Sequence, residues 1–409
     1  MKQLLLIAYY FPPLGGAGVQ RSAKLAKYLA RMGWRLYVVA AEPAPFEPLD
    51  PSLEEDINHP AIQVVRVTNR EPFRGWDRFP GGWRVRAFLQ DWLLFPDRMS
   101  GWLKPALATA GAICKEHPGI PVLTTSAPYT AHLIGLRLKE LYHSLWFADF
   151  RDEWTQNPYL KYPTGFHATL QRRAEAKVLT AADGVISVTE TITTGLKQLL
   201  PRTPAAFATI PNGFDPEDLN DLTYHPKSSF VITHVGTLNG SRLELVKPLI
   251  ELLKQLADQG RFRPGTLKLR LIGPGAYQSL NLAGYDFVEI CAYLPHHDAL
   301  AAMADSDLLI LAEGNPAAFT GKIFEYLGLR RPVLGLVHPQ SPAAALIRAA
   351  NAGWVVDAGD RESLAKLMMD AYQFWQAGQA PLTFNLEVID RYNRQRQAER
   401  FAEFITRGG

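Results

Sequence analysis

The sequence predicts an α/β protein with two doubly wound domains, each a parallel sheet with helices on both faces. The chain has 409 residues, more than one compact core usually holds. Short apolar runs typical of buried strands alternate with helical patterns along almost its whole length. Glycine-rich turns follow several of these runs, as in βαβ units, whose ligands bind at the carboxyl ends of the strands. We therefore expect two Rossmann-like sheets facing each other across a ligand-binding cleft.

The first half opens with the elements of a βαβ unit. Leu4–Ala8 is an apolar run, Pro12–Gly18 is a turn-rich segment, and a helical spacing through Ala23, Ala26 and Leu29 leads to a second apolar run, Leu36–Ala40. The pattern then predicts strands over 62–67, 121–126, 145–150 and 184–188, and helices over 133–138 and 174–182. We place the first domain at residues 1–205.

The second half repeats this alternation. Strands are predicted over 207–210, 231–235, 267–272, 288–291, 307–311, 332–336 and 353–357, and helices over 244–257, 297–304, 323–329 and 343–350. Between the halves, Pro211–Pro216 is dense in turn formers and indicates the end of an interdomain crossing. We place the second domain at residues 206–385. The charged tail, 386–409, is expected to be helical over 386–405 and to pack back on the first domain.

Composition narrows the class of protein. Hydrophobic residues make up 47% and charged residues 20%, as in an ordered globular protein, and the net charge of +3 gives no global reason to expect nucleic acid. Cys114 and Cys291 form no CxxC motif, so no disulfide framework is expected. No apolar run approaches the roughly 20 residues of a membrane-spanning helix, and the N-terminal run is too short for a signal peptide. A cytoplasmic protein is expected.

Three glycine-containing segments could approach phosphate groups. Gly15 and Gly16 follow the first strand, although their spacing does not match GxGxxG, so they form either a phosphate cradle or a tight turn. In the second domain, Gly236–Ser241 follows a strand, and the cations Arg242 and Lys247 come next. These two side chains either bind a diphosphate or are solvated residues of a helix.

The third segment precedes the predicted helix that carries Glu325. Thr320, Gly321 and Lys322 combine free backbone donors with a positive charge at its start. Glu325 could accept two hydrogen bonds from a ribose diol. Its neighbours Ile323, Phe324, Tyr326 and Leu327 are expected to be buried, and a carboxylate among them needs a partner.

Together these segments resemble glycosyltransferase family 4, retaining enzymes of the GT-B fold, over nearly the whole chain. The resemblance rests on an ordered set of motifs: Tyr10-Phe11-Pro12-Pro13 with Gly15-Gly16, Asp183 with Val185, Ser187 and Val188, Ile210-Pro211-Asn212-Gly213-Phe214-Asp215, Gly236-Thr237-Leu238, Leu271-Ile272-Gly273-Pro274-Gly275, and Phe324-Glu325-Tyr326-Leu327-Gly328 with Pro332-Val333-Leu334.

The resemblance implies a transferase that moves a sugar from a UDP-, GDP- or TDP-linked donor to a hydroxyl acceptor. The backbone around Gly15, Gly16, Gly236 and Thr237, with Arg242 and the loop Phe319, Thr320, Gly321 and Lys322, would hold the diphosphate and sugar. Glu325 would bind the ribose, and Gly273, Pro274, Tyr293 and Leu294 would frame the base. Assembly of surface polysaccharide or of a lipid-linked glycan is the expected use.

Two departures from the family pattern concern the reacting groups. The glutamate expected eight positions before Glu325 is replaced by Ala317, with Glu313 nearby as a substitute at the wrong spacing. The histidine that many members carry after a first-domain strand is missing from Asp149–Trp154, where Asp149 and Asp152 could orient an acceptor hydroxyl. His132 is a further candidate, or an ordinary helix histidine.

Metal independence is expected, because no Asp-x-Asp motif lies where a metal would bridge the diphosphate. Asp305-Ser306-Asp307 matches the Asp-x-Asp motif, but it leads directly into a predicted strand, so Asp305 is interpreted as a helix-end residue. Two alternatives remain open at this point. A nucleotide-sugar hydrolase or epimerase is compatible with Ala317, and a sugar-nucleotide-binding protein without catalysis is compatible with the same fold.

Residues 66–104 mix basic and aromatic side chains in a way that suits a membrane surface. These residues are Arg66, Arg70, Arg74, Arg78, Arg84, Arg86 and Arg98, with Trp76, Trp83, Trp92, Trp102, Phe88 and Phe95. The segment is either a peripheral contact at the inner face of the cell membrane or a core-packed helical insertion with exposed arginines.

Overall fold

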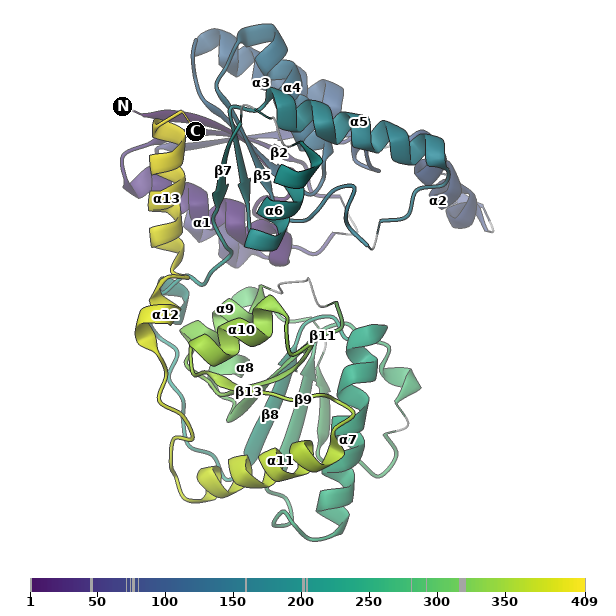
Figure 1. Ribbon diagram of the computed structural model, residues 1–409, viewed down its shortest axis with the longest axis vertical. Helices are drawn as coiled ribbons and strands as arrows, with labels where there is room; N and C mark the ends of the chain where they lie inside the picture. The colour runs from purple at the N-terminus through teal and green to yellow at the C-terminus, as the bar shows by residue number, and fades with distance from the viewer. Residues whose placement is uncertain are drawn as a thin grey trace. The chain divides into compact units, whose positions relative to one another are not determined.

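The chain forms two compact units in a computed structural model that describes residues 2–408 except 45–46, 71, 74, 76–77, 80, 159, 201–202, 204, 281, 292 and 316–320. The first unit comprises Met1–Asn212 with Arg394–Gly409, and the second comprises Gly213–Asn393 (Figure 1). The sequence placed these boundaries after residues 205 and 385, so the chain crosses later than expected in both directions. The turn-rich segment 211–216 spans the first crossing.

The first unit contains a seven-stranded parallel sheet in the order β3-β2-β1-β4-β5-β6-β7. Its strands are β1 (Gln3–Ile7), β2 (Arg35–Ala41), β3 (Ile62–Val67), β4 (Val122–Ser126), β5 (Trp146–Phe150), β6 (Gly184–Ser187) and β7 (Ala206–Thr209). All residues of β4 and β5 are buried, as expected for central strands covered on both faces.

Alternate residues of β1 enter two separate cores on opposite faces of this sheet. Leu5 and Ile7 pack in one core, and Leu4 and Leu6 pack in the other, because successive side chains of a strand point to opposite faces. The helices of this unit are α1 (Ala17–Arg31), α2 (Gly82–Leu93), α3 (Leu103–Glu116), α4 (Thr130–Tyr142), α5 (Gly165–Ala181), α6 (Glu190–Leu199) and α13 (Arg394–Thr406), with short 3-10 turns η1 (Pro51–Ile57) and η3 (Ser100–Trp102).

The second unit contains a six-stranded parallel sheet in the order β10-β9-β8-β11-β12-β13. Its strands are β8 (Phe230–Val235), β9 (Leu267–Ile272), β10 (Val288–Cys291), β11 (Leu308–Glu313), β12 (Val333–Val337) and β13 (Gly353–Val355). Its helices are α7 (Ser241–Asp258), α8 (His296–Ala304), α9 (Lys322–Gly328), α10 (Pro342–Ala349), α11 (Arg361–Gln376) and α12 (Leu386–Asp390), with 3-10 turns η4 (Glu217–Leu219) and η5 (Tyr277–Ser279). Leu308 and Ile310 enter one core, and Leu309 and Leu311 enter the other.

Both sheets place their first strand next to their fourth, β1 beside β4 and β8 beside β11. The strand order reverses direction at these pairs, and ligands of doubly wound folds bind beyond the carboxyl ends of the strands at this switch point. The loops after β1, β4, β8 and β11 are therefore the segments in which each unit can build a site.

The C-terminal tail is two helices, whereas the sequence predicted one over 386–405. The break between α12 and α13 lies where the chain leaves the second unit. There the Phe214 N–H donates to the Tyr392 carbonyl at 3.0 Å, and Phe214 pairs with Asn393 in an isolated β-bridge. α13 then packs against α1 in the first unit, where Phe404 contacts Phe147 with ring centroids 5.8 Å apart.

Candidate active site

Two glycine-containing loops leave the carboxyl ends of β8 and β9 side by side. The Gly236 N–H donates to the Ile272 carbonyl and the Leu238 N–H donates to the Pro274 carbonyl, both at 2.9 Å. Gly236 has φ 127° and Gly273 has φ 117°, and a Cβ on Gly273 would lie 2.7 Å from the Gly236 carbonyl oxygen. Position 273 therefore requires glycine, since any side chain there would push the two loops apart.

Arg242, in the first turn of α7, is held by Glu313, the last residue of β11. Its Nη2 lies 2.6 Å and its Nε 3.2 Å from Glu313 Oε2, and Glu313 Oε1 accepts the Asn315 N–H at 3.0 Å. The Glu313 side chain is 4% exposed, whereas that of Arg242 is 39% exposed. Gly314 permits this approach, because a Cβ there would lie 2.7 Å from the Ser241 side chain. A buried acid thus orients a cation that still reaches the surface.

Lys322 and Glu325, in the first turn of α9, form an ion pair with 3.1 Å between Nζ and Oε2. On the other side, Nδ1 of His296 lies 3.9 Å from Glu325 Oε1, and Nε2 of the same ring lies 3.3 Å from Asp218 Oδ2. The four neighbours of Glu325 are buried as expected: Ile323, Phe324, Tyr326 and Leu327. The carboxylate has the partner that its surroundings require, and its side chain remains 15% exposed.

His234 lies in β8, two residues before the first glycine loop, with both nitrogens buried. Its Nδ1 lies 3.2 Å from the Ile310 carbonyl, to which it donates, and Nε2 has no partner among the residues that the structure describes. Burial lowers the pKa of His234 to about 4, with the charges of Arg242 and Lys322 acting in the same direction and the Ile310 bond opposing them. The ring is therefore neutral at neutral pH and adds no charge to this edge of the sheet.

In the first unit, the two glycines after β1 differ in what they offer. The Gly15 N–H donates to the Pro48 carbonyl at 2.8 Å, so it is occupied, and the expectation that it holds a phosphate is corrected. Gly16 is exposed, has φ 93° and immediately precedes α1, and within the described part of the chain no backbone hydrogen bond uses its N–H. Of the two, Gly16 fits the predicted role at a helix N-terminus.

Asp149, near the end of β5, is engaged by Arg21 of α1. The Arg21 guanidinium donates to both carboxylate oxygens at 2.9 and 2.7 Å, and Thr125 Oγ1 donates to Oδ2 at 2.9 Å. Arg21 also donates to the carbonyls of Ile210 and Pro211 at 2.9 and 3.0 Å. Both partners are almost fully buried. This geometry assigns Asp149 to fastening α1 onto the sheet, in place of the expected contact with an acceptor hydroxyl.

His132, in α4, is sealed in the core rather than placed at the surface. Its side chain is fully buried, its Nδ1 lies 2.8 Å from Thr124 Oγ1, and its ring centroid lies 4.4 Å from that of Phe150. Burial lowers the pKa of His132 to about 3, with Asp149 opposing the shift. Of the two interpretations of this residue, the structure supports the helix histidine packed inside the domain.

Asp152 follows β5 in an exposed position, so it can meet a substrate. Partial desolvation raises the pKa of its carboxyl group, while the adjacent Arg151 opposes the change. Arg151 donates to the Gly18 carbonyl in α1, so the segment after β5 is tied to the start of the first helix. Asp152 therefore remains the accessible acid in this part of the first unit.

Comparisons with known proteins support one family. Residues 16–218 match the model of Glycosyltransferase Family 4. The chain is a glycosyltransferase, and this match lies almost wholly within its first unit. Among curated proteins, none matches it.

Solved structures share the GT-B fold of this glycosyltransferase over its whole length. Sucrose-phosphate synthase from Thermosynechococcus elongatus superposes with a TM-score of 0.66 at 14% identity, covering 100% of this chain and 99% of that one. Anabaena HepE, solved in complex with UDP, gives a TM-score of 0.65 at 16% identity over 99% and 100%. WaaG, a glycosyltransferase involved in lipopolysaccharide biosynthesis, gives 0.55 at 16% over 98% and 95%.

The remaining predicted donor-binding residues of the glycosyltransferase lie at the same edge of the second sheet. Thr237 and Pro274 are exposed in the two glycine loops, and Gly321 is exposed before α9. Tyr293 and Leu294 follow β10, where Tyr293 is exposed and Leu294 packs on the core under α8. The predicted residues Phe319 and Thr320, and the substituted position Ala317, lie outside the described residues.

Sequence reasoning missed three contributors to this edge of the second sheet. The sequence suggested Glu313 as a substitute for the glutamate that Ala317 replaces, and did not predict that it pairs with Arg242. His234 and His296 were not singled out. A carboxylate that closes the apolar run Leu308–Glu313 was a usable signal, because a charge at the carboxyl end of a buried strand needs a partner.

Proposed function

We propose that this glycosyltransferase moves a sugar from a nucleotide-diphosphate donor to a hydroxyl acceptor, with retention of configuration at the anomeric carbon. The observation that carries this proposal is the Arg242–Glu313 pair beside the two glycine loops. It presents an oriented cation at the switch point of the second sheet, where a diphosphate would be bound. During transfer the bond from the anomeric carbon to the diphosphate breaks, a bond to the acceptor oxygen forms, and the acceptor hydroxyl gives its proton to the departing diphosphate oxygen. The departing nucleoside diphosphate gains negative charge, which Arg242 and Lys322 stabilise.

Different segments at this edge are proposed to bind the phosphates, the ribose and the base of the donor. The backbone of Gly236, Thr237 and Gly321 is proposed to contact phosphate and sugar. Glu325 accepts hydrogen bonds from the ribose diol. When the ribose binds, these hydrogen bonds replace part of the ion pair between the Glu325 carboxylate and Lys322. We propose that the exposed Pro274 and Tyr293, with the buried Gly273 and the partly buried Leu294 beside them, frame the base.

Uracil is the base that we propose first among the UDP, GDP and TDP classes. The support is a likeness of fold: HepE was solved with UDP, with UDP and glucose, and with UDP-glucose. The sugar and the acceptor are not specified by this likeness.

We propose that transfer is metal-independent, with cationic side chains in place of a divalent ion. Asp305 ends α8 and pairs with Lys227, and Asp307 precedes β11, where it accepts from Tyr224 and from the Val231 N–H at 2.7 Å. Both carboxylates lie at the amino ends of the strands, at the edge of the sheet away from Arg242. They therefore cannot bridge a diphosphate at the proposed site within this unit.

For the acceptor we propose a lipid-linked glycan or surface polysaccharide reached at a membrane surface. α2 lies beside the start of α5 in the first unit (Figure 1). It exposes apolar and basic side chains. Its Phe88 and Trp92 rings lie 5.3 Å apart, and Trp92 packs edge-on against His167 of α5. The exposed members of this lipid-facing surface are Phe79, Trp83, Val85, Phe88, Trp92, Leu93, Phe95 and Phe166, with Arg70, Arg78 and Arg84.

Two residues expected at that surface belong elsewhere. Trp102 is fully buried, and Arg66 donates to the carbonyls of Pro12 and Ala41. Arg98 stays exposed beside α2, where it pairs with Asp91 at 2.8 Å. Arg74 and Trp76 lie outside the described residues. No described helix is both long enough and apolar enough to cross a bilayer, so the proposed contact is interfacial.

Thermal-shift measurements with UDP, GDP, TDP and ADP test the donor class, because a ligand that binds the folded state raises the unfolding temperature by mass action. UDP is expected to give the largest shift. Turnover of the matching sugar donors, with and without EDTA, then tests the chemistry, and NMR of the anomeric proton reports retention. Inversion would contradict the proposed stereochemistry, sugar release that needs no acceptor would favour a hydrolase, and activity lost in EDTA and restored by Mn²⁺ would overturn metal independence.

A further inference from the structure

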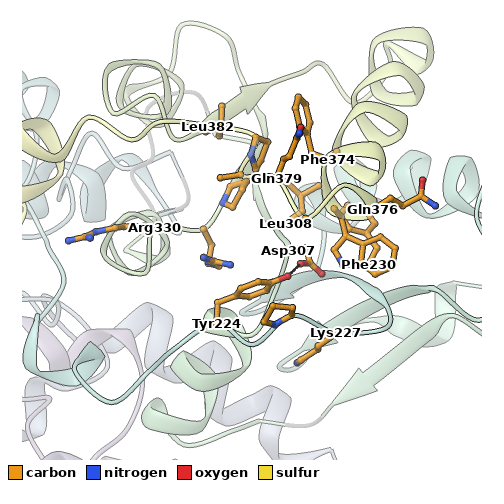
Figure 2. Close-up of a pocket in the computed structure, with 18 of the residues that line it drawn as sticks. Tyr224, Lys227, Phe230, Asp307, Leu308, Arg330, Phe374, Gln376, Gln379 and Leu382 are labelled. Carbon is orange, nitrogen blue, oxygen red and sulfur yellow. Dashed lines mark hydrogen bonds between the residues drawn. The ribbon is translucent and has the colours of Figure 1, made fainter.

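A cavity of about 500 Å³ lies at the amino ends of the strands of the second sheet. Phe230 and Leu308, the first residues of β8 and β11, form its floor, and Phe374, Gln376, Gln379 and Leu382, from the end of α11 and the segment after it, face them (Figure 2). β8 has six residues and spans about 20 Å, so this cavity is separated from the glycine loops by the length of the sheet. Its volume lies in the range of small-molecule sites.

Aromatic side chains line the inner wall of this cavity. Phe230 is buried, Trp354 and Trp375 are partly buried, and Phe374 is exposed at the mouth. Trp375 stacks on Tyr372 with centroids 5.4 Å apart, and its ring lies 6.1 Å from that of Phe230, so these rings form a connected surface. Such a wall suits an apolar chain or ring rather than a hydrated ligand.

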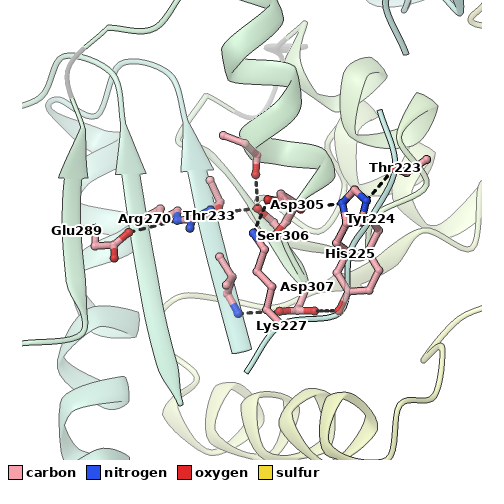
Figure 3. A network of polar contacts seen from close by, with 12 residues as sticks. Thr223, Tyr224, His225, Lys227, Thr233, Arg270, Glu289, Asp305, Ser306 and Asp307 are labelled. Carbon is pink, nitrogen blue, oxygen red and sulfur yellow. Dashed lines mark hydrogen bonds and ion pairs between the residues drawn. The ribbon is translucent and has the colours of Figure 1, made fainter. Parts of the chain in front are cut away.

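The charges around the cavity are mostly positive. Lys227, Arg263, Arg330 and Arg331 line it, and Asp307 is the acid among its described lining residues. Lys227 is neutralised by Asp305, and Asp307 already accepts from Tyr224 and from the Val231 N–H (Figure 3). The Arg330 side chain extends away from the other labelled residues in Figure 2. The local excess of positive charge therefore rests on Arg263 and Arg331.

Arg331 is the cation placed to meet a ligand. Its guanidinium lies 4.3 Å from the centroid of the Tyr224 ring, and no described residue forms a hydrogen bond or ion pair with that guanidinium. Burial lowers the pKa of Arg331, with Tyr224 and Asp307 opposing the shift. A partly buried guanidinium with unused donors is costly unless an anion is available to it.

We propose that this cavity binds a small anionic amphiphile, whose apolar body lies on Phe230, Trp354 and Trp375 and whose single head group is bound by Arg331. The site does not overlap the proposed donor site, and its occupancy does not require transferase activity. A bound ligand also contacts the segment from Gly378 to Phe384, which leads from α11 to α12, and restricts its motion.

Calorimetric titration of the intact protein with decanoate, decyl phosphate and decanol tests this proposal. Both anions are expected to bind at least tenfold more tightly than decanol, since a charge-assisted hydrogen bond is worth about a factor of ten. A higher affinity for decanoate than for decyl phosphate would identify the head group as a carboxylate. A higher affinity for decyl phosphate would identify it as a phosphate. Hydrogen exchange should slow at residues 224–230 and 376–384 when ligand is bound.

Variants locate the head group. Arg331→Gln should weaken decanoate binding about tenfold and Arg263→Gln about threefold, while Arg261→Gln, an exposed arginine outside the cavity, should leave it unchanged. A UDP-induced thermal shift retained in each variant reports folding separately, and if Arg331→Gln does not fold, Arg263→Gln carries the comparison. Equal affinity for decanol and decanoate, protection elsewhere in the chain, or no binding by the wild type at millimolar decanoate would overturn the proposal.

Discussion

Arg242 and Glu313 meet across the switch point of the second sheet, with 2.6 Å between Nη2 and Oε2. Arg242 comes from the start of α7 and Glu313 from the end of β11, 71 residues apart in sequence. The acid is almost fully buried, so the guanidinium is fixed on one side while the other side remains open to a ligand. This pair gives the second unit a cation whose direction is set before the donor binds.

Arg242→Gln should lower kcat/KM for the nucleotide-sugar donor by about 10²–10³, because a preorganised charge is lost from the leaving group. Glu313→Gln should cause a smaller loss, about tenfold, since the amide can still accept from Arg242 but holds it less firmly. Steady-state kinetics against Glu244→Gln, an exposed acid of α7, measure both. Full activity in Arg242→Gln would remove this residue from the proposed mechanism.

Gly273→Ala should abolish nucleotide binding with a modest loss of stability. The new Cβ would lie 2.7 Å from the Gly236 carbonyl oxygen at a φ of 117°, so the two loops must separate. The UDP-induced thermal shift measures this effect. Gly165→Ala is the matched control, because that glycine opens α5 with no heavy atom near the added Cβ. Normal UDP binding by Gly273→Ala would show that the paired loops do not hold the donor.

Asp149→Asn should destabilise the first unit and not merely slow catalysis. Removing one charge of a buried pair costs about 3–5 kcal/mol, which for a domain of this size lowers the unfolding temperature by about 10 °C. Differential scanning calorimetry is the measurement, and Asp258→Asn, in the exposed pair with Lys254, is the control with little expected change. A variant with unchanged unfolding temperature and no turnover would instead place Asp149 in acceptor activation.

The side chains of His132 and His234 should not titrate between pH 7.5 and 5, because burial lowers their pKa values to about 3 and about 4. NMR of labelled histidine, assigned with His132→Gln and His234→Gln, tests this. In the unfolded chain these rings take up protons below about pH 6.5. The stability of the wild type relative to each variant should therefore fall as pH drops below 6.5, by about 1.4 kcal/mol per unit for each histidine. Titration of either ring near pH 6.5 would show that it is not sealed in the core.

The lipid-facing surface of α2 should bind anionic vesicles in a salt-sensitive manner. Trp83→Ser combined with Phe88→Ser should lower co-sedimentation by at least tenfold, because each exposed aromatic residue loses apolar area that would enter the interface. Leu141→Ser, at an exposed leucine of α4, should leave binding unchanged. Equal binding to neutral vesicles, or none to either kind, would contradict a charged interfacial contact.

Most strands could be located from the sequence because buried parallel strands are short uninterrupted apolar runs. β3, β9 and β10 match the predicted ranges at both ends. The prediction of a single helix for the tail was wrong, because the break at 391–393 does not interrupt the helical spacing of its apolar residues. The helices α3, α6 and α11 were not predicted, and the segment 66–104 could be described only by its composition. Weak periodicity does not explain all three, because α6 is as amphipathic as the predicted α1 and its helical spacing was a usable signal.

The sequence by itself determined the doubly wound class, the family resemblance and the edge of the second sheet where Gly236, Gly273, Arg242, Lys322 and Glu325 gather. This is possible because carboxyl ends of parallel strands share one edge, so order along the chain predicts proximity. Only the tertiary structure decided what individual side chains do in either unit. In the folded chain Arg242 forms an ion pair with Glu313, and Asp149 forms one with Arg21. The Gly15 N–H donates to the Pro48 carbonyl, and His132 is buried in the core. The physical reason is that burial and pairing depend on contacts between residues far apart in sequence, and residue type alone does not carry that information.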